Sequence, residues 1–213
     1  MFRCEIDHLT VTAPSLALGA AYVERELGIA LQPGGEHPRM GTHNLLLRLG
    51  DALFLEVIAV NPAAERPPRP RWFALDELRD DSAPRLAHWV ARTGAIRSAP
   101  PEYLKVTGPI ETMTRGGMQW LITIPSDGAL PLDGAAPALI EWPTGVHPSA
   151  QLQDQGCTLH GFEIRTAAYE KTRALLDLLS MRSEVKVVAL PQGEATRLVA
   201  HIHTPSGIRC IGA

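Results

Sequence analysis

Apolar and polar residues alternate in short runs along the chain, and glycine and proline separate these runs. Residues 4–12 (CEIDHLTVT) alternate in a way that is typical of a β-strand. A helical segment then runs to about residue 26, and Gly28 is a natural helix end. After a glycine-rich loop come two strand-like runs, at residues 43–48 and 52–60. The predicted order of these first elements is β-α-β-β-β.

The same order recurs further along the chain, so we expect an internal repeat. Residues 86–93 (LAHWVART) resemble the first strand, and residues 94–105 form a proline-broken helical or irregular segment. This second unit continues with three strand candidates, at residues 109–114, 119–125 and 138–142. A third unit starts with a strand at residues 158–166 and a helix at residues 167–180, and its last strands are predicted at residues 184–190, 196–203 and 208–212. We predict an α+β fold of three βαβββ-like modules.

Two connectors separate the predicted modules. The first contains the run ERPPRPR at residues 65–71, and the second lies near residues 144–155. They predict the following boundaries: modules at about residues 1–62 and 84–148, which form one domain over residues 1–150, and a third module at residues 156–213.

Composition and charge exclude several classes of protein. Apolar residues make up 45% of the chain and charged residues 20%, which suits a packed core with an ordinary surface. A net charge of −3 without clusters of Lys and Arg argues against nucleic acid or an anionic membrane as a partner. No apolar run is long enough to span a membrane, and the first residues lack the layout of a signal peptide. Three scattered cysteines predict reduced, mostly structural thiols in a cytoplasmic protein.

Each module carries a histidine at the same place in its first strand. Alignment of IDHLTVTA, LAHWVART and TLHGFEIRT superimposes His8, His88 and His160. The last strands of the first two modules, FLEV and LIEW, also superimpose and supply Glu56 and Glu141. Because side chains alternate across a strand, the histidines and glutamates of two facing modules can point to one concave face. Two imidazoles and two carboxylates there would form a four-ligand shell for a divalent metal.

At these residues the chain resembles the glyoxalase-like domain group of the vicinal oxygen chelate superfamily, over roughly residues 4–150. Besides DHLTV and FLEVIAV, residues 34–44 (GGEHPRMGTHN) are similar to the group's fingerprint GG-x-HP-x-x-GT-x-N. Further similar segments are HWVART, residues 115–124, and residues 139–142 followed by His147-Pro148. The resemblance implies that paired βαβββ modules form a half-open barrel around a metal. By position, it implies that the metal ligands are His8, Glu56, His88 and Glu141.

The function that this resemblance implies is a metal-dependent lyase or isomerase for a small oxygenated metabolite. A divalent ion (zinc, nickel, manganese or iron) would chelate substrate oxygens, and Glu141 or Glu56 would transfer a proton. Glu141 lies in the apolar run ALIEW, where a carboxylate needs a partner, either a metal or an arginine. An iron-dependent ring-cleaving dioxygenase is one alternative. Another is a metal-free protein of the bleomycin-resistance type that sequesters a ligand, in which His8 and Glu56 would form a hydrogen-bonded pair.

Candidate residues for substrate binding lie on the fingerprint loop and on later strands. The loop could simply form turns, but its polar groups lie on a rigid scaffold beside the mouth of the predicted barrel. Cationic side chains suit a substrate with a carboxylate or phosphate, and tryptophans would either line the pocket or pack in the core. The candidates are His37, Arg39, Thr42, Asn44, Arg115, Trp120 and His147.

The third module is expected to be structural. His160 recurs in it, but its last strand offers no glutamate. The remaining polar candidates in this module are Glu163, His201 and His203. Its helix is expected either to cover its own sheet or to form the surface of a homodimer.

Overall fold

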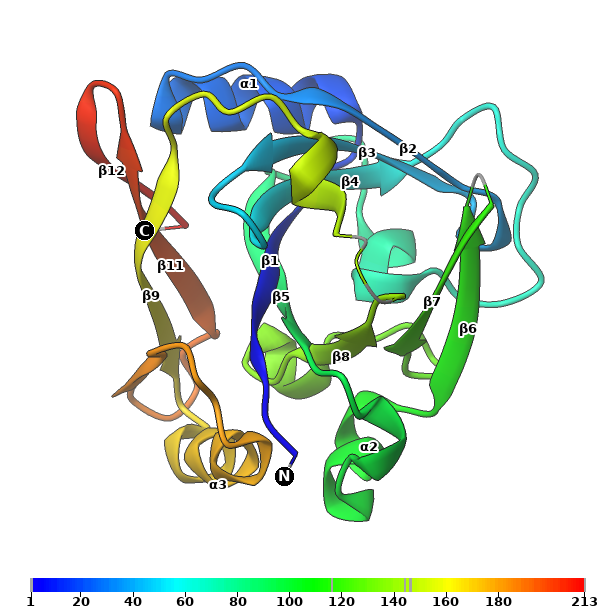
Figure 1. The fold of residues 1–213 in the computed structure, drawn as a ribbon, viewed down its shortest axis with the longest axis vertical. Coiled ribbons are helices and arrows are strands. Elements are labelled where there is room, and N and C mark those ends of the chain that lie inside the picture. The colour runs from blue at the N-terminus through cyan, green and yellow to red at the C-terminus, as the bar shows by residue number, and fades with distance from the viewer. Residues whose placement is uncertain (1, 116, 144, 146, 213) are drawn as a thin grey trace.

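The structure is a computed structural model that describes residues 2–115, 117–143, 145 and 147–212. It contains an eight-stranded sheet, which curls into a half-open barrel, and a separate four-stranded sheet beside it (Figure 1). The first sheet holds the two predicted N-terminal modules, and the second holds the third. The predicted α+β class and the β-α-β-β-β order of each module are confirmed.

The first module forms one half of the barrel, with the strand order β2-β3-β4-β1. Ser15 caps its helix by accepting a hydrogen bond from Leu18 N, and Gly28 ends the helix at a φ of 72°. The glycine-rich segment, which we expected to be a loop, instead forms edge strand β2, where Pro33 is tolerated because one side of the strand is unpaired. The elements are β1 (Glu5–Thr12), α1 (Leu16–Leu27), β2 (Gln32–His37), a 3-10 turn (Pro38–Met40), β3 (Thr42–Arg48) and β4 (Phe54–Val60).

The second module repeats this arrangement with the order β5-β8-β7-β6. In both modules the first strand pairs in parallel with the last, β1 with β4 and β5 with β8. The elements are β5 (Arg85–Arg92), α2 (Pro101–Thr107), β6 (Ile110–Arg115), β7 (Met118–Thr123) and β8 (Ala138–Glu141), with 3-10 turns at Trp72–Glu77, Ile96–Ser98 and Pro131–Gly134.

The two modules meet at the antiparallel pair β1 and β5, where Leu9 lies opposite Trp89. This pairing relates the modules by a local twofold, in which His8 and His88 take equivalent places. The twofold agrees with the sequence alignment of the two histidines.

The eight-stranded sheet separates two apolar clusters. The cluster on its outer face includes Leu9, Val57 and Trp89 and continues into α1 and the third module. The cluster on its inner face includes Ile58, Val90 and Ile140 and is closed by the turn Trp72–Glu77. The inner face therefore carries both the second apolar cluster and the candidate site.

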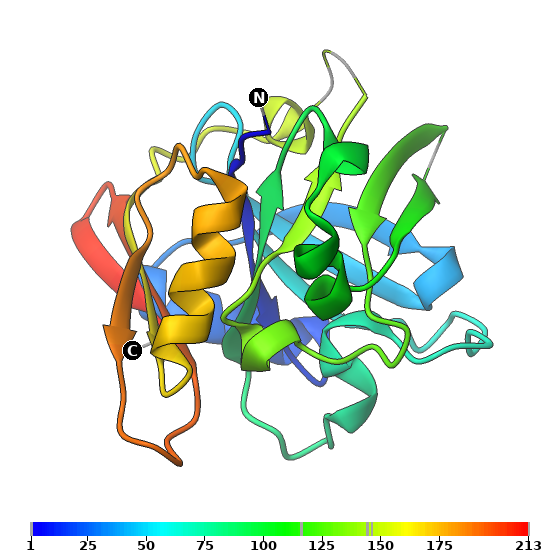
Figure 2. The ribbon, with the colours of Figure 1, turned by 90° about the horizontal axis from the view of Figure 1, so that it is seen from below.

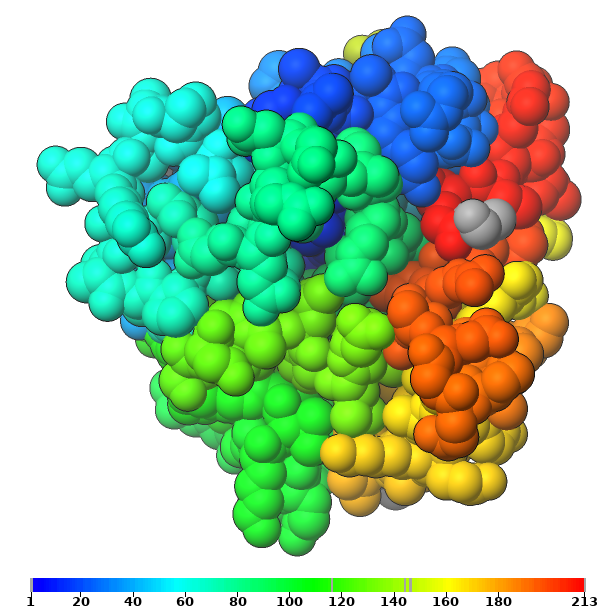
Figure 3. Space-filling model, turned by 180° about the vertical axis from the view of Figure 1, so that it is seen from behind, coloured from blue at the N-terminus to red at the C-terminus, as the bar shows by residue number. Residues whose placement is uncertain are grey.

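The third module has the predicted element order but a different strand order, β10-β9-β11-β12. Its first strand pairs in parallel with the strand that follows the helix, not with the last strand. Figure 2 shows α3 near the N-terminus, and Figure 3 shows the C-terminal residues abutting the earlier modules. The elements are β9 (Thr158–Thr166), α3 (Tyr169–Leu179), β10 (Lys186–Ala189), β11 (Arg197–Thr204) and β12 (Gly207–Ile211), after a 3-10 turn at Pro148–Gln151. Of the helices described, none has the length and apolar character needed to cross a membrane.

Candidate functional site

Strand β1 brings two neighbouring polar side chains together. The pairing of β1 with β5 shifts between Ile6 and His8, so that Asp7 is an extra residue in the strand. Such a bulge redirects side chains that strict alternation would send to opposite faces. Asp7 Oδ1 lies 2.6 Å from His8 Nδ1, although the two residues are adjacent. The bulge thus builds a carboxylate–imidazole pair on one strand.

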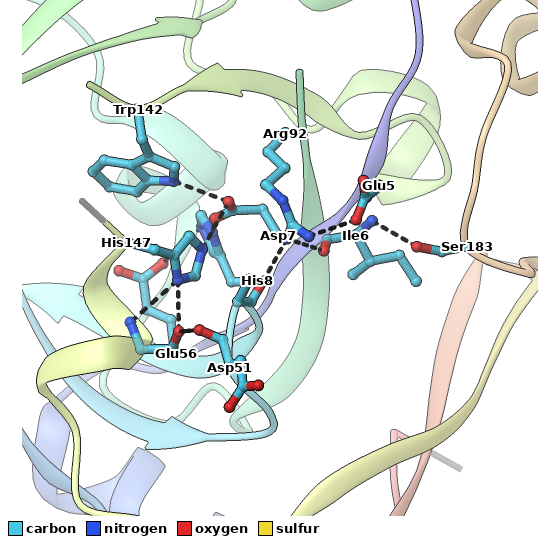
Figure 4. Close-up of polar contacts among 12 residues, drawn as sticks. Glu5, Ile6, Asp7, His8, Asp51, Glu56, Arg92, Trp142, His147 and Ser183 are labelled. Atoms are coloured by element: carbon cyan, nitrogen blue, oxygen red, sulfur yellow. Dashed lines mark hydrogen bonds and ion pairs between the residues drawn. The ribbon is translucent and has the colours of Figure 1, made fainter. Parts of the chain in front are cut away.

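Asp7 is a fully buried carboxylate at the centre of a polar network (Figure 4). Its Oδ2 accepts hydrogen bonds from Trp142 Nε1 at 2.9 Å and from His147 Nε2 at 3.1 Å. Burial alone would raise the pKa of Asp7, but the hydrogen bonds from His147 and His8 outweigh burial and hold it below its usual range. An ionised carboxylate only accepts hydrogen bonds, so Nδ1 of His8 carries the proton. In the neutral form of His8, Nε2 then keeps its lone pair.

Glu56, on β4, faces Nε2 of His8. Its Oε2 lies 3.8 Å from His8 Nε2, and its Oε1 accepts a hydrogen bond from Asn44 Nδ2 at 2.6 Å. Thr10 adds a longer contact of 3.4 Å to Oε2. The imidazole of His8 also stacks on Phe54, with 4.5 Å between ring centroids. His8 is therefore held between two carboxylates, Asp7 at Nδ1 and Glu56 at Nε2.

The fingerprint glycines allow the side chains behind Glu56 to come close to the backbone. Gly35 N donates to Asn44 Oδ1 at 2.7 Å. A Cβ on Gly34 would lie 2.1 Å from Asn44 Oδ1, and one on Gly35 would lie 3.1 Å from Arg115 Cδ. Gly41 ends a turn at a φ of 60°, as expected, whereas Gly34 and Gly35 lie in strand β2 rather than in a turn. They make room for Asn44, which holds Glu56 in place, and for Arg115.

His8 and Glu56 open into a pocket with about 430 Å³ of space between its walls, part of it open to solvent. Its other polar residues include His37, Asn44 and Arg115. Burial, with the charges of Arg115 and His8, lowers the pKa of His37 to about 3, so this histidine is neutral at pH 7. The aromatic walls of the pocket are Phe54, Trp72, Phe73, Trp120 and Trp142.

Trp72 also leaves a donor unused. Among the residues described, its Nε1 is buried and has no hydrogen-bond partner. A buried N–H without a partner costs about 1–3 kcal/mol, so an acceptor from a ligand or water would stabilise it.

The structure does not bring Glu141 into this pocket. Ile140 lines the pocket, and Glu141, the next residue on β8, faces the opposite side of the sheet. There Glu141 Oε2 accepts a hydrogen bond from Ile96 N at 2.6 Å. The carboxylate does have the partner that the sequence required, but this partner is a backbone N–H rather than a metal or an arginine. The expectation that Glu141 shares a concave face with His8 is corrected.

Strand register explains this correction. Glu56 pairs with Thr10 on β1, whereas the equivalent residue of β5, Val90, pairs with Ala138. The counterpart of Glu56 in the second module is therefore Ala138. Superposing FLEV on LIEW shifts the register by three residues and so exchanges the two faces.

His88 lies on the inner face but is covered. Its Nε2 accepts a hydrogen bond from Ala138 N at 3.2 Å, and the ring of Phe73 lies 4.9 Å away. Its Nδ1 has no partner among the residues described. Burial, together with nearby His8, lowers the pKa of His88 to about 3. Phe73, in the turn Trp72–Glu77, therefore covers His88.

The predicted four-ligand shell does not fit this arrangement. Only His8 Nε2 and Glu56 converge, and the described part of the chain contains no group of three or more His, Cys, Asp or Glu residues that could hold a metal ion. A catalytic zinc needs three protein ligands, and the two-histidine, one-carboxylate set of an iron dioxygenase needs a second available imidazole. The lone pair of His88 is already used.

The remaining predicted residues either line the pocket, support a residue of the site, or lie away from it. His37, Asn44, Arg115 and Trp120 line the pocket. Thr42 supports His37 through a 3.2 Å contact to Nδ1, and His147 hydrogen-bonds Asp7. Arg39 bridges the two ends of the curled sheet, because it bonds to Glu111 and to Thr112 O at 2.6 Å.

Sequence reasoning missed Asp7, Phe54 and Trp72 as parts of the site. Asp7 stands next to His8 in the motif DHLTV, and that adjacency was the available signal. Trp72 and Phe73 follow the ERPPRPR connector directly, between the two predicted modules.

Comparison with known proteins shows the family. A family model described as a glyoxalase-like domain matches residues 6–179. No curated protein matches the chain. A hypothetical protein from Staphylococcus aureus has a similar solved structure, with a TM-score of 0.57, 13% identity and coverage of 91% of this chain and 87% of that one.

Two enzymes are also among the similar structures. A mutant of 4-hydroxymandelate synthase from Streptomyces coelicolor gives a TM-score of 0.50 at 12% identity, over 97% of this chain and 61% of that one. Methylmalonyl-CoA epimerase from Mycobacterium tuberculosis gives a TM-score of 0.41 at 17% identity, over 65% of this chain and 87% of that one. At 12% identity, the similarity to the synthase shows the fold alone. Since the family model spans most of the sequence, the chain belongs to the glyoxalase-like domain family, within the vicinal oxygen chelate superfamily.

Proposed function

We propose that this protein is an enzyme that moves a proton on a small oxygenated substrate, as an isomerase or lyase does. One observation carries the proposal: His8 stands between the carboxylates of Asp7 and Glu56 at the wall of a pocket. Because Glu141 faces the other side of the sheet and His88 is covered by Phe73, no step of this proposal passes through a metal.

His8 is the general base in this proposal. With its proton on Nδ1, it takes a proton at Nε2 from the carbon beside a substrate carbonyl. Buried Asp7 then stabilises the imidazolium, as a carboxylate behind a catalytic histidine does. Glu56 adds a second negative charge, 3.8 Å from Nε2, and can take up or return the proton in turn. This assignment keeps Glu56 as a catalytic residue and removes Glu141.

The pocket walls favour a substrate with an apolar or aromatic body and one anionic group. Five aromatic side chains supply the apolar surface, and Arg115 is the cation among the residues that line the pocket. His37, neutral at pH 7, adds a polar group without a charge.

The test is proton exchange on carbon. A panel of small 2-oxo acids with aromatic and aliphatic side chains is incubated with the protein in D₂O, and loss of the C3 proton signals is followed by NMR. The wild type is expected to accelerate exchange for at least one member. His8→Asn is expected to slow that exchange by about 10²–10⁴-fold, the usual contribution of a general base.

Glu141→Gln is the matched control, because Glu141 lies on the other face of the sheet. Its exchange rate is expected to stay within about twofold of the wild type, while metal analysis of untagged protein is expected to give no stoichiometric divalent ion. If Glu141→Gln abolished exchange while His8→Asn did not, the assignment of the base would be wrong.

Ligand sequestration is the second candidate, and the aromatic walls favour it. In that case panel members would bind and raise the melting temperature of the protein, with no exchange above the uncatalysed rate. The cytoplasmic location and the homodimer stay predictions from the sequence.

A further inference from the structure

The C-terminal sheet carries a second cluster of reactive side chains, far along the chain from the pocket residues. Cys210 on β12 and His201 on β11 are directly opposite each other in the antiparallel pair. Cys210 Sγ lies 3.0 Å from His201 Nδ1, and His201 Nε2 lies 3.6 Å from Glu163 Oε1 on β9. Three neighbouring strands thus line up a thiol, an imidazole and a carboxylate.

Strand pairing explains why these three side chains share a face. Glu163 pairs with Val199, two residues from His201, and Gly161 stands directly opposite His201. The imidazole of His201 lies near Gly161. A Cβ added there would only reach van der Waals contact, 3.8 Å from His201 Cδ2. The opposite face of the sheet, with Phe162 and Ile164, is buried in the core.

The charges around the cluster keep Glu163 ionised. Lys186 donates to Glu163 Oε1 at 3.0 Å and Arg165 donates to Oε2 at 3.0 Å. These hydrogen bonds lower the pKa of Glu163. The ionised carboxylate of Glu163 therefore faces Nε2 of His201.

Cys210 differs from the other two cysteines in its surroundings. Cys4 and Cys157 are buried, and burial raises the pKa of the Cys4 thiol to about 12 and also raises that of Cys157. Cys210 is partly exposed, and it borders a surface cleft that also includes Arg25, Glu26 and Arg197. Tyr22 and Arg85 complete the titratable and charged groups around that cleft.

We propose that Cys210 is an activated thiol that forms covalent adducts with small carbon electrophiles, with His201 as its base and Glu163 orienting His201. The thiol proton passes to Nδ1 of His201, and the sulfur adds to the terminal carbon of an activated C=C bond. The π bond breaks as the C–S bond forms, and the proton returns from His201 to the neighbouring carbon. Atoms and electrons balance without an oxidant or a reductant.

The experiment measures alkylation by N-ethylmaleimide between pH 6 and 9, with each cysteine followed by peptide mass spectrometry. In the wild type, Cys210 is expected to react before Cys4 and Cys157. At pH 6.5 its rate is expected to fall at least threefold in His201→Asn and by a smaller factor in Glu163→Gln. The difference between the wild type and His201→Asn should shrink towards pH 9, because hydroxide then replaces the imidazole as the base.

Circular dichroism and the melting temperature establish that each variant is folded before its rate is compared, and His201→Gln replaces any variant that is not. A rate in folded His201→Asn within threefold of the wild type across the whole pH range would overturn the proposal. So would faster labelling of Cys4 or Cys157 than of Cys210.

Discussion

Two buried histidines make the stability of this protein depend on pH. His37 and His88 have pKa values near 3 in the folded chain, whereas an unfolded chain has a histidine pKa of about 6.5. Below about pH 6.5 the unfolded state therefore binds protons that the folded state does not bind. Each residue lowers the free energy of unfolding by about 1.4 kcal/mol per pH unit as the pH falls from 6.5 towards 3.

His88→Asn tests this dependence. Urea denaturation at pH 6 and pH 5 is expected to show a loss of stability in the wild type that is about 1.2 kcal/mol larger than in the variant, because the unfolded histidine is already partly protonated at pH 6. Above pH 7.5 the contribution of His88 to the pH dependence vanishes. His160→Asn, at an exposed position, serves as the control and should keep the slope of the wild type. Equal slopes in His88→Asn and the wild type would contradict the account.

At the scale of single residues, the sequence predicted part of the site. The alignment of His8 with His88 was correct, because the β1–β5 pair relates the modules by a local twofold. Asp7 could not be placed, since strict alternation sends it away from His8 and only a bulge brings them together. Glu141 was placed on the wrong face, because nothing in LIEW reports its register against β5.

At the scale of elements, the edge strand β2 connects the glycine fingerprint to the acid–base pair. Gly34 packs so closely on Asn44 that a Cβ would stand 2.1 Å from Oδ1 and 3.0 Å from the backbone oxygen of Asn44. Asn44 in turn holds Glu56 through its amide. A substitution at Gly34 on β2 therefore affects the position of Glu56 on β4 through the side chain of Asn44 on β3.

Gly34→Ala is expected to lower the free energy of unfolding by about 1–3 kcal/mol, because Asn44 has to move and Glu56 loses its donor. Gly94→Ala is the matched control, since a Cβ there meets nothing within 4 Å among the described residues. That change should stay within about 0.5 kcal/mol of the wild type. Equal stability of the two variants in urea denaturation would show that Gly34 is not needed for close packing.

The elements themselves were mostly predictable, and their pairing was not. Alternation and glycine or proline boundaries located the strands within a few residues, with β2 as the exception because its glycines resemble a loop. In the third module the same β-α-β-β-β order gives a different sheet, in which β9 pairs with β10 and β11. Local patterns record which face of a strand is buried but not which strand lies beside it.

At the scale of the whole molecule, the third module covers the outer face of the barrel. Phe162 and Ile164 on β9 belong to the same apolar cluster as Trp89 on β5, and the rings of Phe162 and Trp89 lie 5.2 Å apart. At the other end of the interface, Ser183 Oγ accepts a hydrogen bond from Ile6 N at 3.0 Å. The apolar faces of the two sheets are thus buried against each other. This packing supports the expected structural role of the module, while a dimer surface on its helix stays a prediction.

Phe162→Ala tests whether the barrel and the C-terminal sheet unfold together. The side chain is 2% exposed, so its loss leaves a cavity between the two sheets and is expected to cost about 3–5 kcal/mol. Ile208→Ala, at a side chain that is 53% exposed on β12, is the control and should cost far less. Tryptophan fluorescence reports the barrel, and circular dichroism reports both sheets. Because the two sheets share a core, both signals should follow one common unfolding transition in both variants. The alternative outcome is two separate transitions, of which Phe162→Ala shifts only the one that circular dichroism detects and fluorescence does not. That outcome would mean that the barrel is stable without the third module.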